Sequence, residues 1–202
     1  MHRSGFGLRC AFTAKVPSTP DDSSQGVLNG IEKICQEAGI EPSAVGRVMH
    51  GTTVATNAVL ERQGARTGLL ATAGFSDVLE IGRQMRTNIY ELQLDPEAPV
   101  FLSPGARRAE VNERISSSGQ VLCQLDEESL HAGIRQLIDQ KVESVAICFL
   151  FSFLNPIHEI QAREFIKRAY PDLFISISSE VDPAFREYER TVATAFDAYT
   201  NY

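Results

Sequence analysis

The stretch Val142–Phe151, VESVAICFLF, decides the fold class of this 202-residue chain. A continuous apolar run of this length is typical of a strand that is buried on both faces of a sheet. Helical patterns flank it on both sides: Asp126 can cap a helix that runs to Gln140, and Pro156 can open one that runs to Ala169. A buried strand between two helices predicts an α/β fold with a parallel sheet.

Strand-like and helix-like blocks also alternate along the rest of the chain, which we expect to form one domain over residues 1–202. Gly39 ends the first helix, because glycine readily adopts the left-handed conformation found after a helix. The further strands are predicted over Leu8–Val16, Val45–Met49, Arg66–Thr72 and Leu173–Ser178. The further helices are predicted over Asp22–Ala38, Thr53–Arg62, Phe75–Ile81 and Pro183–Tyr199.

The middle of the chain departs from this alternation. Three prolines interrupt Thr87–Pro104, a stretch without clear periodicity, which predicts an extended excursion. Ser116–Gly119 predicts a hairpin turn between the flanks Arg107–Ile115 and Gln120–Leu122. We therefore expect an inserted extended segment near residues 87–122.

Composition limits the partners and the location of the protein. Nineteen basic and 26 acidic residues give a net charge of −7, which disfavours nucleic acid as a partner. No apolar run is long enough to span a bilayer, and the N-terminus lacks the apolar core of a secretory signal, so no membrane partner is expected. The four cysteines are far apart and are typical of free thiols in a reducing cytoplasm: Cys10, Cys35, Cys123 and Cys148.

The first candidate site is the segment His50–Asn57, HGTTVATN, which follows a predicted strand. Ligands of parallel sheets usually bind at the carboxyl ends of the strands. Gly51 permits a tight turn, and free N–H groups at the start of the next helix can hold an anion. His50 is the candidate proton carrier, and the candidate cofactor-binding residues are Gly51, Thr52, Thr53, Thr56 and Asn57. A capped helix beside a buried histidine is the structural alternative.

The second candidate site is the segment Ser178–Thr191, which also begins at a strand end. Glu187 is its candidate catalytic base, and Arg190 and Thr191 are candidate ligands of a substrate or phosphate group. Arg83, beside a glycine at the end of another predicted helix, is a third candidate of this kind. The alternative is a solvated helix face with ion pairs, and a surface position for Arg83.

Two observations limit the metal and nucleotide sites that the sequence can be expected to form. His158–Glu159 lacks the H-E-x-x-H spacing of a zinc helix, so we expect no metal there, and the sequence assigns no metal ligands elsewhere. The standard phosphate-loop, dinucleotide-binding and nucleophile-elbow patterns are also missing.

Taken together, ordered segments of the chain resemble the hydantoinase A/oxoprolinase family in its N-terminal region. They extend over nearly everything from Thr13 to the end. The matching segments are Thr13–Asp22, His50–Leu60, Gly64–Leu70, Gly74–Gln84, Glu113–Ile115, Val145–Phe153, His158–Glu159, Ser178–Glu180 and Arg186–Thr191.

The resemblance implies a ribonuclease-H-like lobe of the sugar kinase, Hsp70 and actin type. It implies an ATP-dependent hydrolase that opens cyclic amides such as hydantoin or 5-oxoproline, with Mg²⁺ or Mn²⁺ as the divalent cation. Phosphorylating the amide oxygen is chemically reasonable, because it breaks the resonance that protects the bond. Acetone and acetophenone carboxylases use the same type of subunit, so a carboxylase subunit is an alternative with the same chemistry.

The chain also departs from the family pattern. Members typically begin with a D-x-G-G-T-F-T-D loop that approaches the phosphates, and they continue into a large second region. Here only Met1–Phe12 precede the match, and the sequence stops at Tyr202. We therefore expect the chain to need a partner subunit or second lobe for activity.

A non-catalytic interaction module is the remaining alternative. It predicts an exposed apolar patch on the last helix, made by Val192, Ala195, Phe196 and Tyr199.

Overall fold

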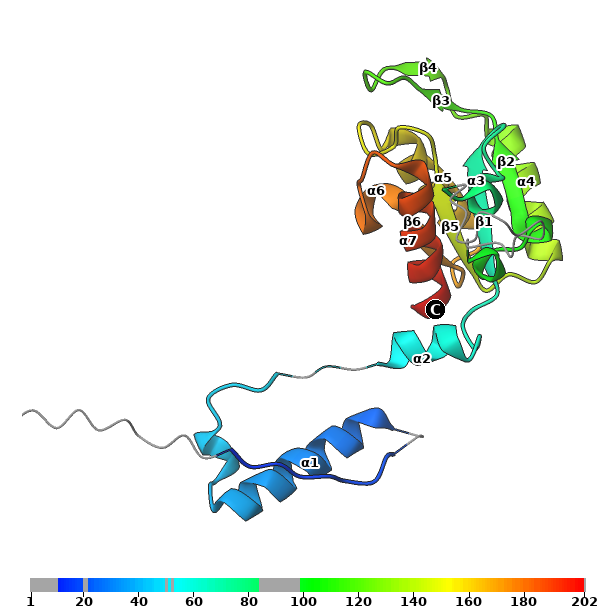
Figure 1. Cartoon of the computed structure of the whole chain (residues 1–202). Helices are drawn as coiled ribbons and strands as arrows, with labels where there is room; N and C mark the ends of the chain where they lie inside the picture. The colour runs from blue at the N-terminus through cyan, green and yellow to red at the C-terminus, as the bar shows by residue number, and fades with distance from the viewer. Residues whose placement is uncertain (1–10, 20–21, 50, 52, 84–98, 202) are drawn as a thin grey trace, which may run out of the picture. The chain divides into compact units, whose positions relative to one another are not determined.

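The computed structural model describes residues 11–19, 22–49, 51, 53–83 and 99–201 (Figure 1). These residues form two compact units, Met1–Thr52 and Thr53–Tyr202. All strands of the described residues lie in the second unit. Among the helices of these residues, none has both the length and the apolar character needed to cross a lipid bilayer.

The first unit is organised around helix α1, Ser23–Ala38. The side chain of Asp22 caps its start by accepting a hydrogen bond of 2.9 Å from the Ser24 N–H. Gly39 ends the helix with φ 66°, as expected for a left-handed cap residue. A 3-10 turn, Pro42–Ala44, follows.

The second unit contains a four-stranded sheet with the order β2-β1-β5-β6, in which all neighbouring strands are parallel. These strands are β1 (Thr67–Thr72), β2 (Arg108–Val111), β5 (Ser144–Cys148) and β6 (Phe174–Ile177). In the register of the central pair, Leu69 lies opposite Ala146 and Leu70 opposite Ile147. Every residue of β1 and β5 is buried, because helices cover both faces of the sheet.

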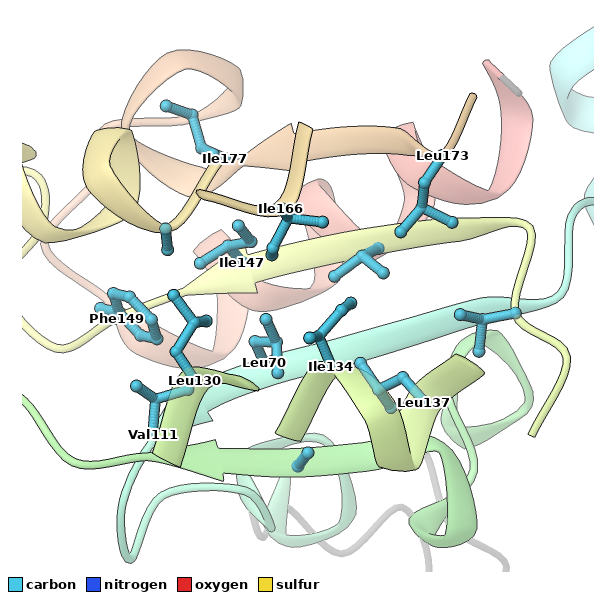
Figure 2. Packing of buried hydrophobic residues seen from close by; sticks show 14 residues of the cluster. Leu70, Val111, Leu130, Ile134, Leu137, Ile147, Phe149, Ile166, Leu173 and Ile177 are labelled. Atoms are coloured by element: carbon cyan, nitrogen blue, oxygen red, sulfur yellow. The ribbon is translucent and has the colours of Figure 1, made fainter. Parts of the chain in front are cut away.

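Helices α4 (Glu127–Asp139) and α5 (Ile157–Ala169) cover one face of the sheet (Figure 1). Their apolar residues pack against alternate residues of the central strands, as the two-residue period of a strand requires. Figure 2 shows this core, in which the fully buried members include Leu70, Leu130, Ile134, Leu137, Ile147, Phe149 and Ile166.

Helix α7 (Glu187–Thr200) and the short helix α3 (Val78–Ile81) cover the other face, and α2 (Val54–Leu60) contacts α7. There Leu69, Ala146 and Cys148 of the sheet contact Leu79 of α3 and the buried side of α7. The sheet is thus the middle layer of three, and the ends of all four parallel strands form its carboxyl edge.

Outside the main sheet, β3 (Arg114–Ile115) and β4 (Val121–Cys123) form an antiparallel hairpin. This confirms the predicted turn at Ser116–Gly119. The inserted segment predicted near residues 87–122 is wrong in part, since β2 joins the sheet as an edge strand. The part predicted over residues 87–98 lies outside the described residues.

Most of the predicted elements are confirmed, with their ends shifted by a few residues. The predicted helices over Phe75–Ile81 and Pro183–Tyr199 begin late, at Val78 and Glu187. Between β6 and α7 a four-residue helix, α6 (Ser178–Val181), was not predicted. It forms where the chain turns away from the carboxyl edge of the sheet.

Two predicted strands are wrong. Residues 11–16 of the predicted strand Leu8–Val16 form no strand and instead lie along α1, where the Lys15 carbonyl accepts a hydrogen bond of 3.0 Å from Lys33 Nζ. Val45–Met49 also forms no strand, and Met49 is 87% exposed. A strand requires a partner that supplies the second half of its hydrogen bonds, and neither segment has one among the described residues.

A single methyl group tests the packing between the start of β1 and the end of α7. A Cβ at Gly64 would overlap the ring of Tyr199, a residue that is 4% exposed. The backbone carbonyl of Tyr199 also accepts a hydrogen bond of 2.9 Å from the Ala65 N–H. We expect Gly64→Ala to lower the free energy of unfolding by about 1–3 kcal/mol, measured by urea denaturation. Gly105→Ala is the control, because its nearest atom would be Glu80 Oε1 at 3.6 Å. Equal stabilities of the two variants would contradict this packing.

Candidate functional site

A pocket of about 590 Å³ opens at the carboxyl ends of β1 and β5. This is the edge where parallel sheets usually bind their ligands. Three segments form its wall: the loop and short helix after β1, the turn after β5 and the start of α7. The lining residues are Gly74, Phe75, Asp77, Val78, Ile81, Gly82, Leu150, Phe151, Glu187 and Tyr188.

Backbone conformations that most residues avoid shape this wall. Gly74 has φ 83°, and Gly82 has φ 55° with ψ −146°, a combination open almost only to glycine. Phe151 has φ 57°, which is rare for a bulky side chain and costs about 1–2 kcal/mol. Its carbonyl accepts hydrogen bonds from Leu154 N at 2.9 Å and Asn155 N at 3.3 Å, and these stabilise the turn.

The lining of the pocket is mainly apolar, with two carboxylates. Glu187 is half-buried and Asp77 is exposed. Neither has a hydrogen bond or ion pair to another side chain within the part of the chain that the structure describes. Both are therefore available to a ligand that offers a hydrogen-bond donor.

Arg83 and Arg114 lie near the pocket, but no arginine is among the described residues that line it. Arg83 forms an ion pair of 2.7 Å with Glu189, and its guanidinium carbon lies 6.0 Å from the centre of the Tyr188 ring. The backbone N–H of Glu189 itself and then Arg83 hold the pKa of the Glu189 carboxyl below its usual value. Arg114 lies over the ring of Phe75 at 5.0 Å. The positive charges at the rim are thus already in contact with protein groups.

The buried carboxylate of Glu159, in the first turn of α5, anchors the turn after β5 that leads into the pocket wall. It is fully buried, and Oε1 accepts hydrogen bonds from Phe149 N at 2.9 Å and from Ser178 Oγ at 2.6 Å. Its Oε2 accepts one of 2.9 Å from Ser179 N. Glu159 therefore joins the ends of β5 and β6.

Arg190 completes this network from α7. Its side chain is 1% exposed and donates to Ser178 Oγ at 3.1 Å, to the Ala184 carbonyl at 2.8 Å and to the Phe149 carbonyl at 3.0 Å. The guanidinium lies over the Phe153 ring at 5.3 Å. Its positive charge compensates the negative charge of Glu159, and the Ser178 hydroxyl forms hydrogen bonds with both side chains.

A second buried network connects the end of β1 to the same turn after β5. The Thr72 hydroxyl donates to Glu113 Oε1 and accepts a hydrogen bond of 2.9 Å from Leu150 N. Glu113 Oε2 lies 2.7 Å from His158 Nδ1, with both side chains at most 1% exposed. His158 Nε2 is buried without a partner among the described residues.

Sequence reasoning missed Glu113, His158 and Glu159 as site-forming residues. His158–Glu159 was considered only as a zinc motif, whereas its two side chains hold two separate buried networks. A signal was present, because both Glu113–Ile115 and His158–Glu159 belong to the segments that carry the family resemblance. Two adjacent ionisable residues in the first turn of a predicted helix were the second signal.

The predicted site residues fall into three places. Glu187 lines the pocket, and Arg83 follows pocket-lining Gly82. Arg190 and Thr191 are buried beneath the pocket, between α7 and the sheet. Their predicted roles in binding a substrate or phosphate group remain predictions, and in this structure their contacts are with the protein itself.

The first predicted constellation is only partly described. His50 and Thr52 lie outside the described residues. Gly51 is exposed in the first unit, while Thr53, Thr56 and Asn57 are exposed at α2 in the second. The Thr53 carbonyl accepts a hydrogen bond of 2.8 Å from Asn57 N, as at any helix start. Cofactor binding by these residues stays a prediction.

The exposed apolar patch predicted on the last helix is wrong. Ala195 is fully buried and Tyr199 is 4% exposed, and Val192 and Phe196 pack against the same cluster. The reason is that this side of α7 covers the sheet. Within the described residues, no group of three or more His, Cys, Asp or Glu side chains is arranged to hold a metal ion.

The buried network around Glu159 makes a stability prediction. In Glu159→Gln the new amide N–H₂ would oppose one of the N–H or O–H donors, and the charge opposite Arg190 would be lost. We expect the free energy of unfolding to fall by about 3 kcal/mol, measured by urea denaturation. Glu164→Gln, at an exposed position of the same helix, should change it by less than about 0.5 kcal/mol. A loss below that limit in Glu159→Gln would refute the role of the network.

The cysteines make a prediction about reactivity. Burial, and then the charge of Glu159, raises the pKa of the Cys148 thiol to about 12, whereas Cys123 is exposed. Because the thiolate is the reactive form, iodoacetamide at about pH 8 should modify Cys123 and spare Cys148 in the folded protein. Peptide mass spectrometry measures both sites, and denaturation should make them equally reactive. Modification of Cys148 at the rate of Cys123 in the native protein would contradict this assignment.

Comparison with known proteins places these features in a family. Residues 8–170 match the family described as the hydantoinase/oxoprolinase N-terminal region. The chain is 38% identical over 191 residues to the caprolactamase subunit alpha of Pseudomonas jessenii, covering 92% of this chain and 27% of that protein. It is 35% identical over 201 residues to the acetophenone carboxylase gamma subunit of Aromatoleum aromaticum, covering 92% and 28%.

A solved structure supports the same relationship. The crystal structure of the ATP-dependent caprolactamase from Pseudomonas jessenii matches 91% of this chain and 27% of that chain, with a TM-score of 0.74 and 37% identity. The chain thus spans just over a quarter of the length of these relatives. Since the match covers most of its sequence and its fold, the chain belongs to the hydantoinase/oxoprolinase N-terminal region family.

Proposed function

We propose that this chain is the N-terminal region of an ATP-dependent enzyme that opens cyclic amides by phosphoryl activation. The observation that carries the proposal is the likeness to the caprolactamase alpha subunit, at 38% identity over 92% of the chain. The pocket at the carboxyl edge of the sheet supports it, because this is where such a fold binds small molecules.

In this proposal the sheet and its helices form a ribonuclease-H-like lobe of the sugar kinase, Hsp70 and actin type. That assignment rests on the family resemblance, and helices on both faces of the sheet are compatible with it. The lobe forms one wall of the active site, and a partner subunit or a second lobe forms the other. Two of the relatives are named as subunits, an alpha and a gamma subunit, which supports a partner here.

The pocket residues have distinct roles in this proposal. The apolar side chains, among them Phe75, Leu150 and Phe151, contact the hydrocarbon part of the ring and exclude water from it. Glu187 accepts a hydrogen bond from the amide N–H and so orients the ring. As the amide oxygen attacks the phosphoryl group, the same carboxylate takes the N–H proton, and it returns that proton to the nitrogen when the C–N bond breaks.

ATP supplies the phosphoryl group that activates the amide oxygen, since O-phosphorylation removes the amide resonance. The described residues do not by themselves fit a triphosphate. Arg83 contacts Glu189, and Arg190 is directed at backbone carbonyls. The described residues also form no group suited to Mg²⁺ or Mn²⁺. The nucleotide and the cation therefore belong, in this proposal, to a site that other parts of the enzyme complete.

A carboxylase subunit is a second candidate. The likeness to the acetophenone carboxylase gamma subunit, at 35% identity over 92% of the chain, favours it. Both candidates activate a carbonyl compound with ATP, and they differ in whether bicarbonate is consumed.

An ADP-release assay tests the proposal. The protein that contains this chain, purified with any subunit that accompanies it, should release ADP in the presence of ε-caprolactam or 2-pyrrolidinone without bicarbonate. Glu187→Gln should lower kcat/KM at least tenfold, because proton transfer by a placed side chain contributes about that much or more. Glu164→Gln is the control and should retain the activity. Release that requires a ketone and bicarbonate would favour the carboxylase, and no release with any of these compounds would refute both candidates.

A further inference from the structure

The charge of the pocket lining indicates which cyclic amides it can accept. Among the described residues that line it, the carboxylates are Asp77 and Glu187, and none of these lining residues is Lys, Arg or His. The remaining lining residues are glycines, aliphatic and aromatic side chains. A ligand within the pocket therefore meets apolar contacts and negative charge.

The neighbouring arginines do not reverse this charge. Arg83 is bound to Glu189 through two nitrogens, each 2.7 Å from Oε1. Arg186 lies 3.8 Å from the same oxygen. Arg114 lies over the ring of Phe75 and does not line the pocket. A ligand carboxylate would have to compete with Glu189 for Arg83 while facing two other carboxylates.

Buried hydrogen bonds hold the backbone of the turn after β5, which supplies Leu150 and Phe151 to the apolar wall. Leu150 N donates to Thr72 Oγ1 at 2.9 Å, and Phe149 N donates to Glu159 Oε1 at 2.9 Å, so the turn before Phe151 is held on both sides.

We propose that this pocket selects neutral cyclic amides and rejects cyclic amides that carry a carboxylate. The naming of cyclic amides as ligands rests on the proposed function, whereas the selection by charge rests on the pocket. A neutral lactam offers its N–H to Glu187 and its methylene groups to the apolar wall. A lactam acid such as 5-oxoproline places a like charge beside Asp77 and Glu187, in a pocket partly shielded from water.

Three ligands that share one ring test the proposal directly. 2-Pyrrolidinone is the bare lactam, 5-oxoproline adds a carboxylate, and 5-oxoprolinamide adds a neutral group of the same size. Titration of the ¹⁵N-labelled full chain, followed by NMR, gives the dissociation constants and identifies the perturbed residues. We expect both neutral ligands to bind at least tenfold more tightly than 5-oxoproline and to perturb the amides of Gly74, Gly82 and Leu150.

Charge-neutralising variants separate electrostatics from shape. In Glu187→Gln and in Asp77→Asn the preference for 5-oxoprolinamide over 5-oxoproline should fall to less than threefold, since the ring and the pocket shape are unchanged. Glu164→Gln, which is exposed on α5, should keep the full preference. Equal or tighter binding of 5-oxoproline, an unchanged preference in both pocket variants, or no perturbation of the pocket by any of the ligands would each overturn the proposal.

The binding experiment and the ADP-release assay test different claims, so that either claim can fail without the other. If lactams drive ADP release but 5-oxoproline is preferred, only the selection by charge fails. If the binding preference is found but no lactam drives ADP release, the proposed function fails and the pocket assignment stands.

Discussion

The buried carboxylate of Glu159 is the interaction on which the site depends. A charge taken out of water is strongly destabilising unless donors and an opposite charge compensate it. Here three donors come from the residues directly after β5 and β6, and the compensating charge, Arg190, comes from α7. Because these groups come from different elements, compensating the charge of Glu159 holds the ends of β5 and β6 and helix α7 in fixed positions. The turn that carries Leu150 and Phe151 into the pocket follows immediately from the first of these anchored residues.

Helix α7 serves the site in two ways because its residues lie at different depths along the sheet. Glu187 and Thr191 are one turn apart on the same side, yet Glu187 lines the pocket and Thr191 is buried. The first turn of the helix extends past the carboxyl edge of the sheet, and the following turns lie on its face. Position along the helix, and not only its face, thus decides which side chains can reach a ligand. Arg186 and Arg190 differ for the same reason, one exposed and one buried.

The sequence predicted strands β1, β5 and β6 and the helices that cover them, whereas it assigned β2 to an inserted segment and predicted the site only in part. The apolar run Val142–Phe151 is long and buried, so its local pattern agrees with its tertiary surroundings, and β5 is indeed central. Val45–Met49 is a shorter stretch interrupted by Gly46 and Arg47, and it has no partner strand among the described residues. A local pattern does not report whether a partner is present. Glu113 and Glu159 were missed because buried ionisable residues are rare, and their compensation comes from residues far away in the sequence. Of the two predicted catalytic residues, Glu187 lines the pocket and His50 lies outside the described residues.

The charge of the pocket also bears on the kind of chemistry that suits it. Direct attack of water on an amide builds negative charge on the carbonyl oxygen, which donors or cations must stabilise. Asp77 and Glu187 oppose such a charge and favour a proton on the amide nitrogen instead. In the proposed function, an amide oxygen directed away from these carboxylates, toward a phosphoryl donor held outside the described residues, avoids this conflict. The acidic pocket is therefore better suited to orienting the nitrogen side of an activated amide than to hydrolysing the amide by itself.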